Sequence, residues 1–190
     1  MTIPSKDQLK KMFSRSWASE GGETPCGQGS TLTNTAAMRV ALQEWLYKYG
    51  VDVMVDAGCG DFNWVKQLNL GGITYYGYDI VDRKRRDLPF AVKDVITESF
   101  PPCDLVVCKD VFIHWTNEMI MDAIANFRKY TNYMFAESTP GISNDGRPEQ
   151  AGGFARVNLE GLPFNLGPPM EKIKDKKFRR YYGWWDITLL

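Results

Sequence analysis

The stretch Val51-Asp52-Val53-Met54-Val55-Asp56-Ala57-Gly58-Cys59-Gly60-Asp61-Phe62-Asn63-Trp64 decides the fold of this chain. Residues 51–57 are mainly apolar and rich in β-branched side chains, so they predict a short buried strand. Two glycines then turn the chain, because glycine readily adopts positive φ angles, and residues 62–68 predict the start of a helix. A strand that ends in an acid and is followed by a glycine turn and a helix is typical of the first half of a nucleotide-binding βαβ unit.

The spacing Asp-x-Gly-x-Gly, beginning at Asp56, lacks the third glycine of the dinucleotide-binding fingerprint. The acid that precedes the glycines would repel a pyrophosphate. The pattern therefore favours a ligand with a cationic or zwitterionic group and no phosphate. A plain structural turn is the alternative interpretation.

Composition excludes several classes of protein. Lys+Arg and Asp+Glu each number 23 in 190 residues, and a formal net charge of zero argues against a protein that binds duplex DNA, although a local basic patch is still compatible with it. No apolar run reaches the length of a membrane span, and residues 1–6 contain no signal-peptide core. The four cysteines form no C-x-x-C pair, which predicts reduced thiols in a cytoplasmic protein without a zinc site or disulfides.

The hydrophobic pattern predicts strands that alternate with helices, followed by a closing hairpin. The expected helices cover residues 5–16, 31–49, 62–68 and 116–131, with Ser30 or Thr31 as the N-cap of the second. The expected strands cover 51–57, 73–81, 90–95, 103–110 and 133–139, and a hairpin pairs 171–175 with 182–189 through a connection at 176–180. Residues 21–30 are rich in glycine and predict a loop that is mobile or covers a ligand.

Acidic residues stand at the ends of two predicted strands. Asp79 follows Asp56 by 23 residues, near the usual offset for an acid that binds ribose hydroxyls. Asp94 ends the next strand. An exposed turn is the alternative interpretation of Asp79. The basic run Arg83–Arg86 is typical of a solvated face, and its functional alternative is the capture of an anionic substrate.

The stretch Asp56–Gly60, with Asp79, Asp94 and the end of strand 103–110, resembles the class I S-adenosylmethionine-dependent methyltransferases over residues 29–189. The resemblance implies a Rossmann-like α/β fold with about seven strands in the order 3-2-1-4-5-7-6, an antiparallel strand 7 and helices on both faces. It implies one domain over residues 1–190, in which 1–30 form an N-terminal helix and glycine-rich lid and 31–190 form the core. It assigns the methionine end of the cofactor to the Asp56 turn, the ribose to Asp79 and the adenine to Asp94. The complete set of implied cofactor residues is Ser30, Thr31, Asp56, Gly58, Cys59, Gly60, Asp61, Asp79, Ile80, Asp94, Val95 and Lys109.

The motif Cys59–Trp64, together with Cys108-Lys109-Asp110 and Asn158-Leu159, is similar to a subgroup of small bacterial and viral methyltransferase domains. Members of that subgroup sometimes accompany glycosyltransferases, and they more often carry arginine at the position of Lys109. The resemblance implies a cytoplasmic protein, in the host cytoplasm if it is viral.

The residues after strand 103–110 indicate which atom receives the methyl group. His114 is the only histidine, and its type suits a general base that removes a proton from an alcohol. Asp110 lies four residues earlier, where it would orient the ring or hold a substrate hydroxyl. A structural histidine that bonds a backbone carbonyl is the equal alternative. The stretch 109–112 also lacks the Pro-Pro-aromatic motif of enzymes that methylate DNA bases, and nothing in the spacing of the acids requires a metal.

Polar loop residues and aromatic side chains suit a hydroxyl-rich acceptor such as a sugar or glycan. The predicted substrate contacts are Trp115, Arg147, Arg156, Asn158 and Tyr182. Flat faces for a sugar ring are offered by Trp17, Trp115, Tyr181, Tyr182, Trp184 and Trp185. The sequence thus predicts an O-methyltransferase that uses S-adenosylmethionine and releases S-adenosylhomocysteine. The alternatives are N- or O-methylation of RNA or a small amine, and a non-catalytic domain that only binds the cofactor.

Overall fold

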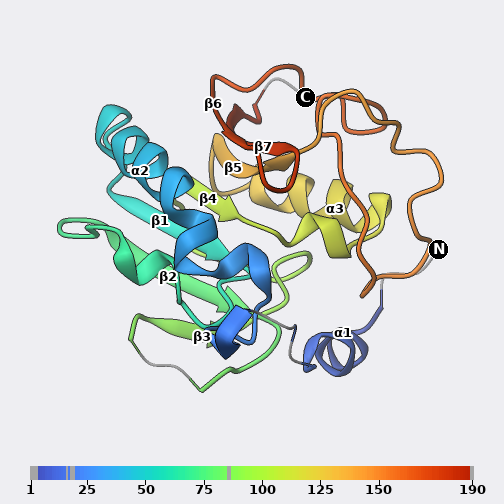
Figure 1. Ribbon diagram of the computed structural model, residues 1–190, viewed down its shortest axis with the longest axis horizontal. Helices are drawn as coiled ribbons and strands as arrows, with labels where there is room; N and C mark the ends of the chain where they lie inside the picture. The colour runs from blue at the N-terminus through green and yellow to red at the C-terminus, as the bar shows by residue number, and fades with distance from the viewer. Residues whose placement is uncertain (1–3, 16, 18–19, 85–86, 189–190) are drawn as a thin grey trace.

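A computed structural model describes residues 4–15, 17, 20–84 and 87–188 (Figure 1). Within these residues, seven strands form one mixed sheet in the order β3-β2-β1-β4-β5-β7-β6. The strands are β1 Val53–Ala57, β2 Thr74–Asp79, β3 Phe90–Val92, β4 Leu105–Cys108, β5 Tyr133–Ser138, β6 Glu171–Asp175 and β7 Arg180–Asp186. β1 to β5 pair in parallel and β7 pairs antiparallel with both neighbours, so the predicted sheet order and the antiparallel last strand are confirmed.

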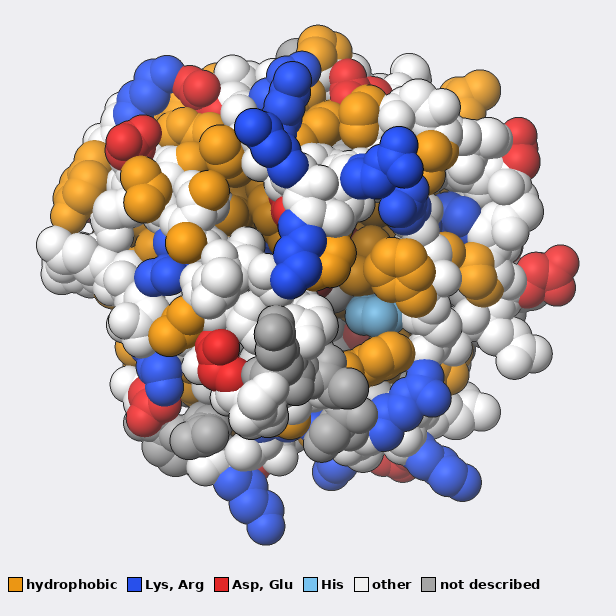
Figure 2. Space-filling view, in the orientation of Figure 1, with side chains coloured by type: hydrophobic (Ala, Val, Ile, Leu, Met, Phe, Trp, Pro, Cys, Tyr) orange, Lys and Arg blue, Asp and Glu red, His pale blue; other side chains and the backbone are white. Residues whose placement is uncertain are grey.

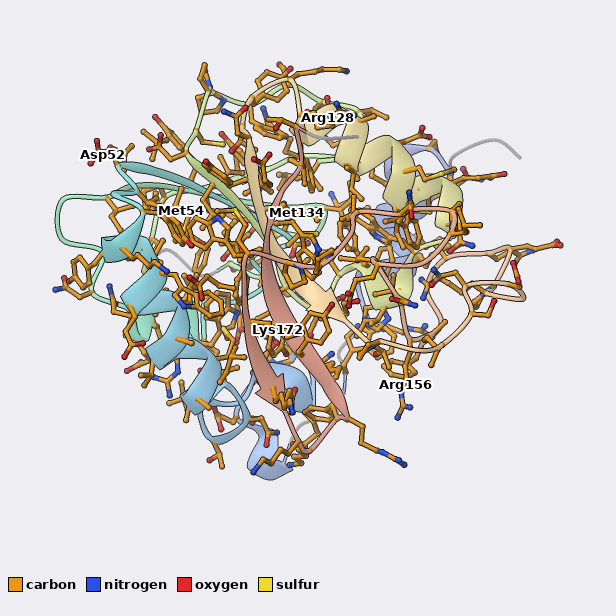
Figure 3. The ribbon with its side chains drawn as sticks, turned by 90° about the horizontal axis from the view of Figure 1, so that it is seen from above. Asp52, Met54, Arg128, Met134, Arg156 and Lys172 are labelled. Atoms are coloured by element: carbon orange, nitrogen blue, oxygen red, sulfur yellow. The ribbon has the colours of Figure 1, made fainter. Side chains whose placement is uncertain are left out.

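Helices cover both faces of the sheet, as predicted (Figure 1). On one face, α2 (Leu32–Lys48) packs in an apolar cluster that includes Met54 of β1. On the other face, α3 (Asn117–Phe127) and α1 (Lys6–Phe13) contribute to a second cluster that includes Met134 of β5. Figure 3 labels both methionines near the middle of the sheet. All four residues of β4 are buried, which is typical of a central parallel strand that is covered on both sides.

Side-chain caps fix where the helices begin. The hydroxyl of Thr31 accepts a hydrogen bond from the Asn34 amide at 3.4 Å, and that of Thr116 accepts one from the Met119 amide at 3.2 Å. Ser5 and Gln8 cap α1 reciprocally in a capping box. Of the two residues predicted to cap the second helix, Thr31 is the N-cap, whereas α1 and α3 end a few residues earlier than the sequence predicts.

The predicted helix at residues 62–68 is wrong, because the structure has only a 3₁₀ turn at Val65–Gln67. Phe62 has a φ of 62°, which is incompatible with a helix start. Residues 61–65 are all buried, Lys66 and Gln67 are exposed, and Leu68 is already extended. Phe62, Trp64 and Val65 pack instead in the apolar cluster that includes residues of α2 and β2.

The closing hairpin is confirmed with a shifted boundary. Arg180 belongs to β7 and pairs with Asp175, so residues 176–179 form the connection. This shift aligns the Arg180 side chain with the end of β4, as described below. No helix within the described residues is long and apolar enough to cross a membrane.

Candidate active site

A cavity of about 930 Å³, counting the part that opens to solvent, lies at the carboxyl ends of β1, β2 and β4. Parallel sheets bind ligands at this edge, because loops from neighbouring strands diverge there. Figure 2 shows a hollow bordered by hydrophobic side chains, with the histidine colour visible inside it, and the chain has one histidine. The predicted residues that line the cavity are Ser30, Gly58, Cys59, Gly60, Asp61, Asp79, Ile80, Asp94, Val95, Lys109, Asp110, His114 and Trp115.

The glycine turn after β1 is held against the end of β2. The amides of Gly58 and Cys59 donate to the Tyr78 carbonyl oxygen at 2.7 and 3.1 Å, and the Gly60 amide donates to Asp79 Oδ2 at 2.9 Å. Gly58 has a φ of 90°, and a Cβ added to it would overlap Val111 Cγ2. Glycine is therefore required here by both backbone conformation and space.

Asp79 and Asp94 present carboxylates with spare acceptor capacity at the cavity wall. Asp79 accepts the amides of Gly60 and Val81, each at 2.9 Å. Asp94 accepts the Ile96 amide at 3.0 Å and the Thr97 hydroxyl at 2.8 Å. Because each carboxylate oxygen has two lone pairs, both acids are oriented by the protein and can still accept bonds from a ligand. Burial raises the pKa of Asp79, and the two amides and Arg83 oppose that effect.

Asp110 lies at the centre of a buried charge cluster. Its carboxylate oxygens lie 2.8 Å from Lys109 Nζ and 2.8 Å from Arg180 Nη1, and one accepts the Tyr182 hydroxyl at 3.1 Å. Burial alone would raise the pKa of Asp110, but the Lys109 and Arg180 charges outweigh burial and hold this pKa below its ordinary value. Asp110 also has a φ of 58°, a strained conformation that is found at functional sites when the surroundings enforce it.

Glu137, at the end of β5, enforces that conformation and was not predicted as a site residue. Its carboxylate accepts the Asp110 amide at 2.7 Å and the Ile113 amide at 3.3 Å. Burial, together with the nearby Asp110 charge, raises the pKa of Glu137 to about 7. An acid that follows the apolar run of β5 is its only signal in the sequence.

The ring of His114 is fixed by the backbone rather than by Asp110. Its Nδ1 lies 2.6 Å from the Gly153 carbonyl oxygen, which only accepts hydrogen bonds, so Nδ1 carries the proton and Nε2 keeps its lone pair. Burial lowers the pKa of His114 below its ordinary value, and the nearby Arg15 charge acts in the same direction. The two sequence alternatives, a structural histidine and a base, are thus compatible, because the carbonyl bond leaves the other nitrogen free to accept a proton.

The N-terminal segment packs on this ring. Trp17 stacks on His114 with 4.5 Å between ring centres, and the Arg15 guanidinium lies 4.8 Å from the centre of a Trp17 ring. Arg15 also donates to the Gly152 carbonyl oxygen, next to the carbonyl that holds His114. Residues before β1 therefore complete the wall around the histidine.

Nuclear magnetic resonance of the single histidine checks this arrangement. At neutral pH the ring nitrogens are expected to show the neutral Nδ1–H tautomer. The titration midpoint is expected below that of the same residue in the urea-unfolded chain, because burial disfavours the charged ring. The stability that this group contributes is present above the unfolded pKa and is lost as the pH falls through the folded pKa. A midpoint above the unfolded value, or the Nε2–H tautomer, would contradict the structure.

The polar residues of the Cys59–Trp64 motif anchor the loop before α2. Asp61 accepts the Thr24 hydroxyl at 3.0 Å, and Asn63 donates to the Ser30 carbonyl oxygen at 3.0 Å and to the Glu23 carboxylate at 2.5 Å. The predicted lid role of residues 1–30 stays a prediction. The contacts show that this loop is bonded directly to the glycine turn.

Six predicted site residues lie outside the cavity lining. Asp56 is buried behind the glycine turn and accepts the Tyr75 hydroxyl at 2.8 Å, and Thr31 caps α2. Arg147 donates to backbone carbonyl oxygens that include those of Phe112 and Trp115, so it braces the loop under His114.

Of the other three predicted site residues, two form hydrogen bonds inside the protein and one is exposed to solvent. Asn158 bonds the Ile142 carbonyl oxygen at 2.9 Å, and Tyr182 is buried with its hydroxyl on Asp110. The exposed Arg156 side chain points away from the body of the molecule in Figure 3. Arg147 and Asn158 thus satisfy backbone carbonyl groups, a role that the sequence does not distinguish from substrate binding.

Further residues line the cavity without having been predicted to bind the cofactor or substrate. They are Leu9, Phe13, Cys26, Trp64, Lys93, Ile96 and Val111. Two others, Trp17 and Arg83, were singled out only as a flat face for a sugar and as part of a basic run. Arg83 donates to the Phe13 carbonyl oxygen at 2.9 Å, so it ties the end of α1 to the loop after β2. An apolar stripe on a predicted helix is the only sequence signal for Leu9 and Phe13.

No family model matches the sequence, and no functionally curated protein is similar to it. Solved structures are similar in fold. Magnesium protoporphyrin IX methyltransferase from Synechocystis PCC 6803, with bound S-adenosylhomocysteine, superposes with a TM-score of 0.62 at 17% identity over 83% of this chain and 84% of that chain. The N-methyltransferase NodS from Bradyrhizobium japonicum WM9 gives 0.59 at 13% identity over 80% and 96%. The chain has the fold of the class I S-adenosylmethionine-dependent methyltransferases. Human N-acetylserotonin methyltransferase, in complex with S-adenosylmethionine, gives 0.53 at 12% identity over 78% of this chain and 54% of that one.

Proposed function

We propose that this chain is an S-adenosylmethionine-dependent O-methyltransferase that acts on a hydroxyl of a sugar or glycan, with His114 as the general base. The observation that carries the proposal is one cavity in which the glycine turn and the acids Asp79 and Asp94 lie together with a neutral histidine. The fold and the cofactors named for its structural neighbours support the cofactor.

The residues present fit the cofactor. The two oriented acids retain lone pairs for ribose hydroxyls and an adenine amino group. Lys109 Nζ donates to the Gly29 carbonyl oxygen at 2.9 Å and to Asp110 at 2.8 Å, which leaves one of its three N–H donors for a carboxylate. When bound, the cofactor supplies an activated methyl group on a sulfonium ion.

A hydroxyl acceptor needs a base, whereas a neutral amine needs mainly placement. The neutral ring of His114, held through Nδ1, offers Nε2 to accept the hydroxyl proton. Asp110 is unsuited to this step because its carboxylate is already bonded to Lys109 and Arg180. Asp110 instead forms part of the cavity wall beside His114.

Aromatic side chains around the base support a carbohydrate acceptor. Phe13, Trp17 and Trp115 line the cavity with His114 and offer apolar faces to a sugar ring. The resemblance of Cys59–Trp64 to methyltransferase domains that accompany glycosyltransferases supports the same class. Arg147 and Asn158 are engaged inside the protein, so the specificity for hydroxyls falls to other groups at the cavity.

Calorimetry with S-adenosylmethionine and S-adenosylhomocysteine tests the cofactor. We expect both to bind, and Asp79→Asn to weaken binding roughly tenfold, because one charged acceptor is lost. Asp52→Asn is the matched control, since Asp52 is an exposed acid just before β1, at the opposite end of the strand from the glycine turn (Figure 3). If neither compound produces heat of binding, the protein does not bind this cofactor, and the proposed methyltransferase activity is refuted.

The acceptor is then sought by methyl transfer to monosaccharides, oligosaccharides, RNA and small amines. Transfer to a carbohydrate hydroxyl supports the proposal. Transfer to an amine that does not depend on His114 would identify an N-methyltransferase instead. Transfer to RNA that depends on Arg83 would identify the basic run after β2 as part of a nucleic-acid site.

A further inference from the structure

The hairpin β6–β7 concentrates positive charge in a chain whose net charge is zero. Residues 171–180 contain six basic and two acidic residues, a net formal charge of +4. Five of the basic side chains are exposed. We call these five the hairpin cations; they are Lys172, Lys174, Lys176, Lys177 and Arg179. Figure 3 labels Lys172 on β6.

The acids of the hairpin do not neutralise these five residues. Glu171 pairs with Lys48 of α2, and Asp175 lies 3.1 Å from Arg180 Nε. Within the described part of the chain, no ion pair involves any of the hairpin cations. Lys174, Lys176 and Arg179 also lack a side-chain hydrogen bond there, so three charges are free to meet a ligand.

Two sets of contacts place the hairpin turn beside the cavity. Arg180, directly after the turn, binds Asp110 in the cavity wall. Lys177 Nζ donates to Asn34 Oδ1 at 2.8 Å, and Asn34 in turn donates to the carbonyl oxygen of Gln28, two residues before the cavity residue Ser30. Figure 2 shows several basic side chains around the hollow.

We propose that the hairpin cations bind anionic groups of the acceptor, so that the acceptor is an acidic glycan rather than a neutral one. The inference rests on the proposed function, because it names the class of glycan that this site methylates. A polyanion held at the turn is attracted by several unpaired charges at once, and its sugar units extend toward His114. Such attraction is expected to weaken as salt is added, because exposed charges are screened.

The hairpin favours an acidic glycan over a nucleic acid. Proteins that bind single strands usually add aromatic platforms on which bases stack. The exposed large aromatic side chains in the described residues are Tyr47 and Phe154, and neither lies on the hairpin. The aromatic ring in the hairpin turn, Phe178, is half-buried and already has Lys177 Nζ at 5.7 Å and the Arg180 guanidinium at 4.9 Å from its centre. Four of the five hairpin cations are lysines, which act as point charges, whereas Arg is the usual choice for phosphate recognition.

Lysine on an edge strand has a second established use. β6 is the last strand of the sheet, and exposed lysines on edge strands prevent pairing between molecules. This role predicts aggregation when the charges are removed, and it predicts no affinity for any polyanion. The two roles are therefore separable by experiment.

The test uses the full chain and polygalacturonate as the probe, with neutral dextran and poly(U) RNA as comparisons. The triple variant Lys174→Gln, Lys176→Gln, Arg179→Gln removes three charges that form no ion pair or side-chain hydrogen bond with the described residues. The matched control removes three exposed lysines elsewhere that form no ion pair within the described residues, Lys10→Gln, Lys11→Gln and Lys129→Gln, for the same change in net charge. We expect the wild type and the control to bind polygalacturonate more tightly than poly(U), and the triple variant to bind it roughly 100-fold more weakly.

Equal loss of affinity in both variants, tighter binding of poly(U), or aggregation of the triple variant with no polyanion binding by the wild type would each overturn the inference. Calorimetry with S-adenosylmethionine separates this failure from that of the proposed function. A chain that binds the cofactor but not polygalacturonate retains the proposed function and loses the acidic acceptor. A chain that binds polygalacturonate but no cofactor loses the proposed function.

Discussion

Replacing Arg180 by methionine is expected to lower the free energy of unfolding by about 3–5 kcal/mol. The Arg180 side chain is buried between Asp110 and Asp175, at 2.8 and 3.1 Å from their carboxylates. Its removal leaves both acids in a poorly solvated environment without their main counter-charge, although Lys109 still contacts Asp110. Urea denaturation measures the change, provided that the slope with urea concentration is unchanged.

Arg179→Met is the control, because this neighbouring arginine is exposed and forms no ion pair within the described residues. Its effect should stay within about 0.5 kcal/mol. A comparable loss of stability in both variants would show that the hairpin turn, and not the buried charge cluster, depends on arginine. An unchanged stability of the Arg180 variant would contradict the cluster itself.

Replacing His114 by glutamine is expected to lower the turnover number by roughly 10²–10⁴-fold once an acceptor has been found. Glutamine is similar in size but does not accept a proton at neutral pH. In the wild type, turnover should fall in acid as the ring is protonated, with a midpoint below the ordinary histidine pKa because the ring is buried. The variant should lack this acid limb.

The matched measurement is affinity for S-adenosylmethionine, which should stay near that of the wild type, since the cofactor is proposed to bind the glycine turn and the strand-end acids. Unchanged turnover in His114→Gln would remove the base and leave a structural histidine bonded to Gly153. Weaker cofactor binding without a change in the pH profile would place His114 in the cofactor site.

The sequence was sufficient to predict the sheet because its signals are local. Val53–Ala57 and Leu105–Cys108 are apolar, β-branched runs too short for helices, and turns punctuate them. The acids Asp79 and Asp94 could be placed at one edge, because parallel strands end on the same side. The helix predicted at 62–68 failed because helix propensity does not reveal that Phe62 has a positive φ and that Leu68 is already extended.

The fine structure of the site could not be predicted in the same way. Asp110 and His114 line the cavity, but their partners come from residues far along the chain: Arg180 and Glu137 for Asp110, and Gly153 and Trp17 for His114. Arg147 is a residue type that often contacts substrates, yet its guanidinium donates hydrogen bonds to backbone carbonyl oxygens. The partner of a hydrogen-bond donor depends on which distant residues pack against it, and the spacing of residues in the sequence does not reveal this.

The sequence alone determined that a strand, the turn Asp56–Gly60 and two later acids meet at one edge of a parallel sheet, because each depends on short-range pattern and on the geometry of parallel strands. Only the tertiary structure decided that Asp110 is neutralised by Arg180 and that the backbone at Gly153 leaves His114 Nε2 available. The ion pairs of Asp110 and the tautomer of His114 depend on residues that are distant in sequence and come into contact only in the folded protein. They therefore cannot be predicted from the spacing of residues in the sequence.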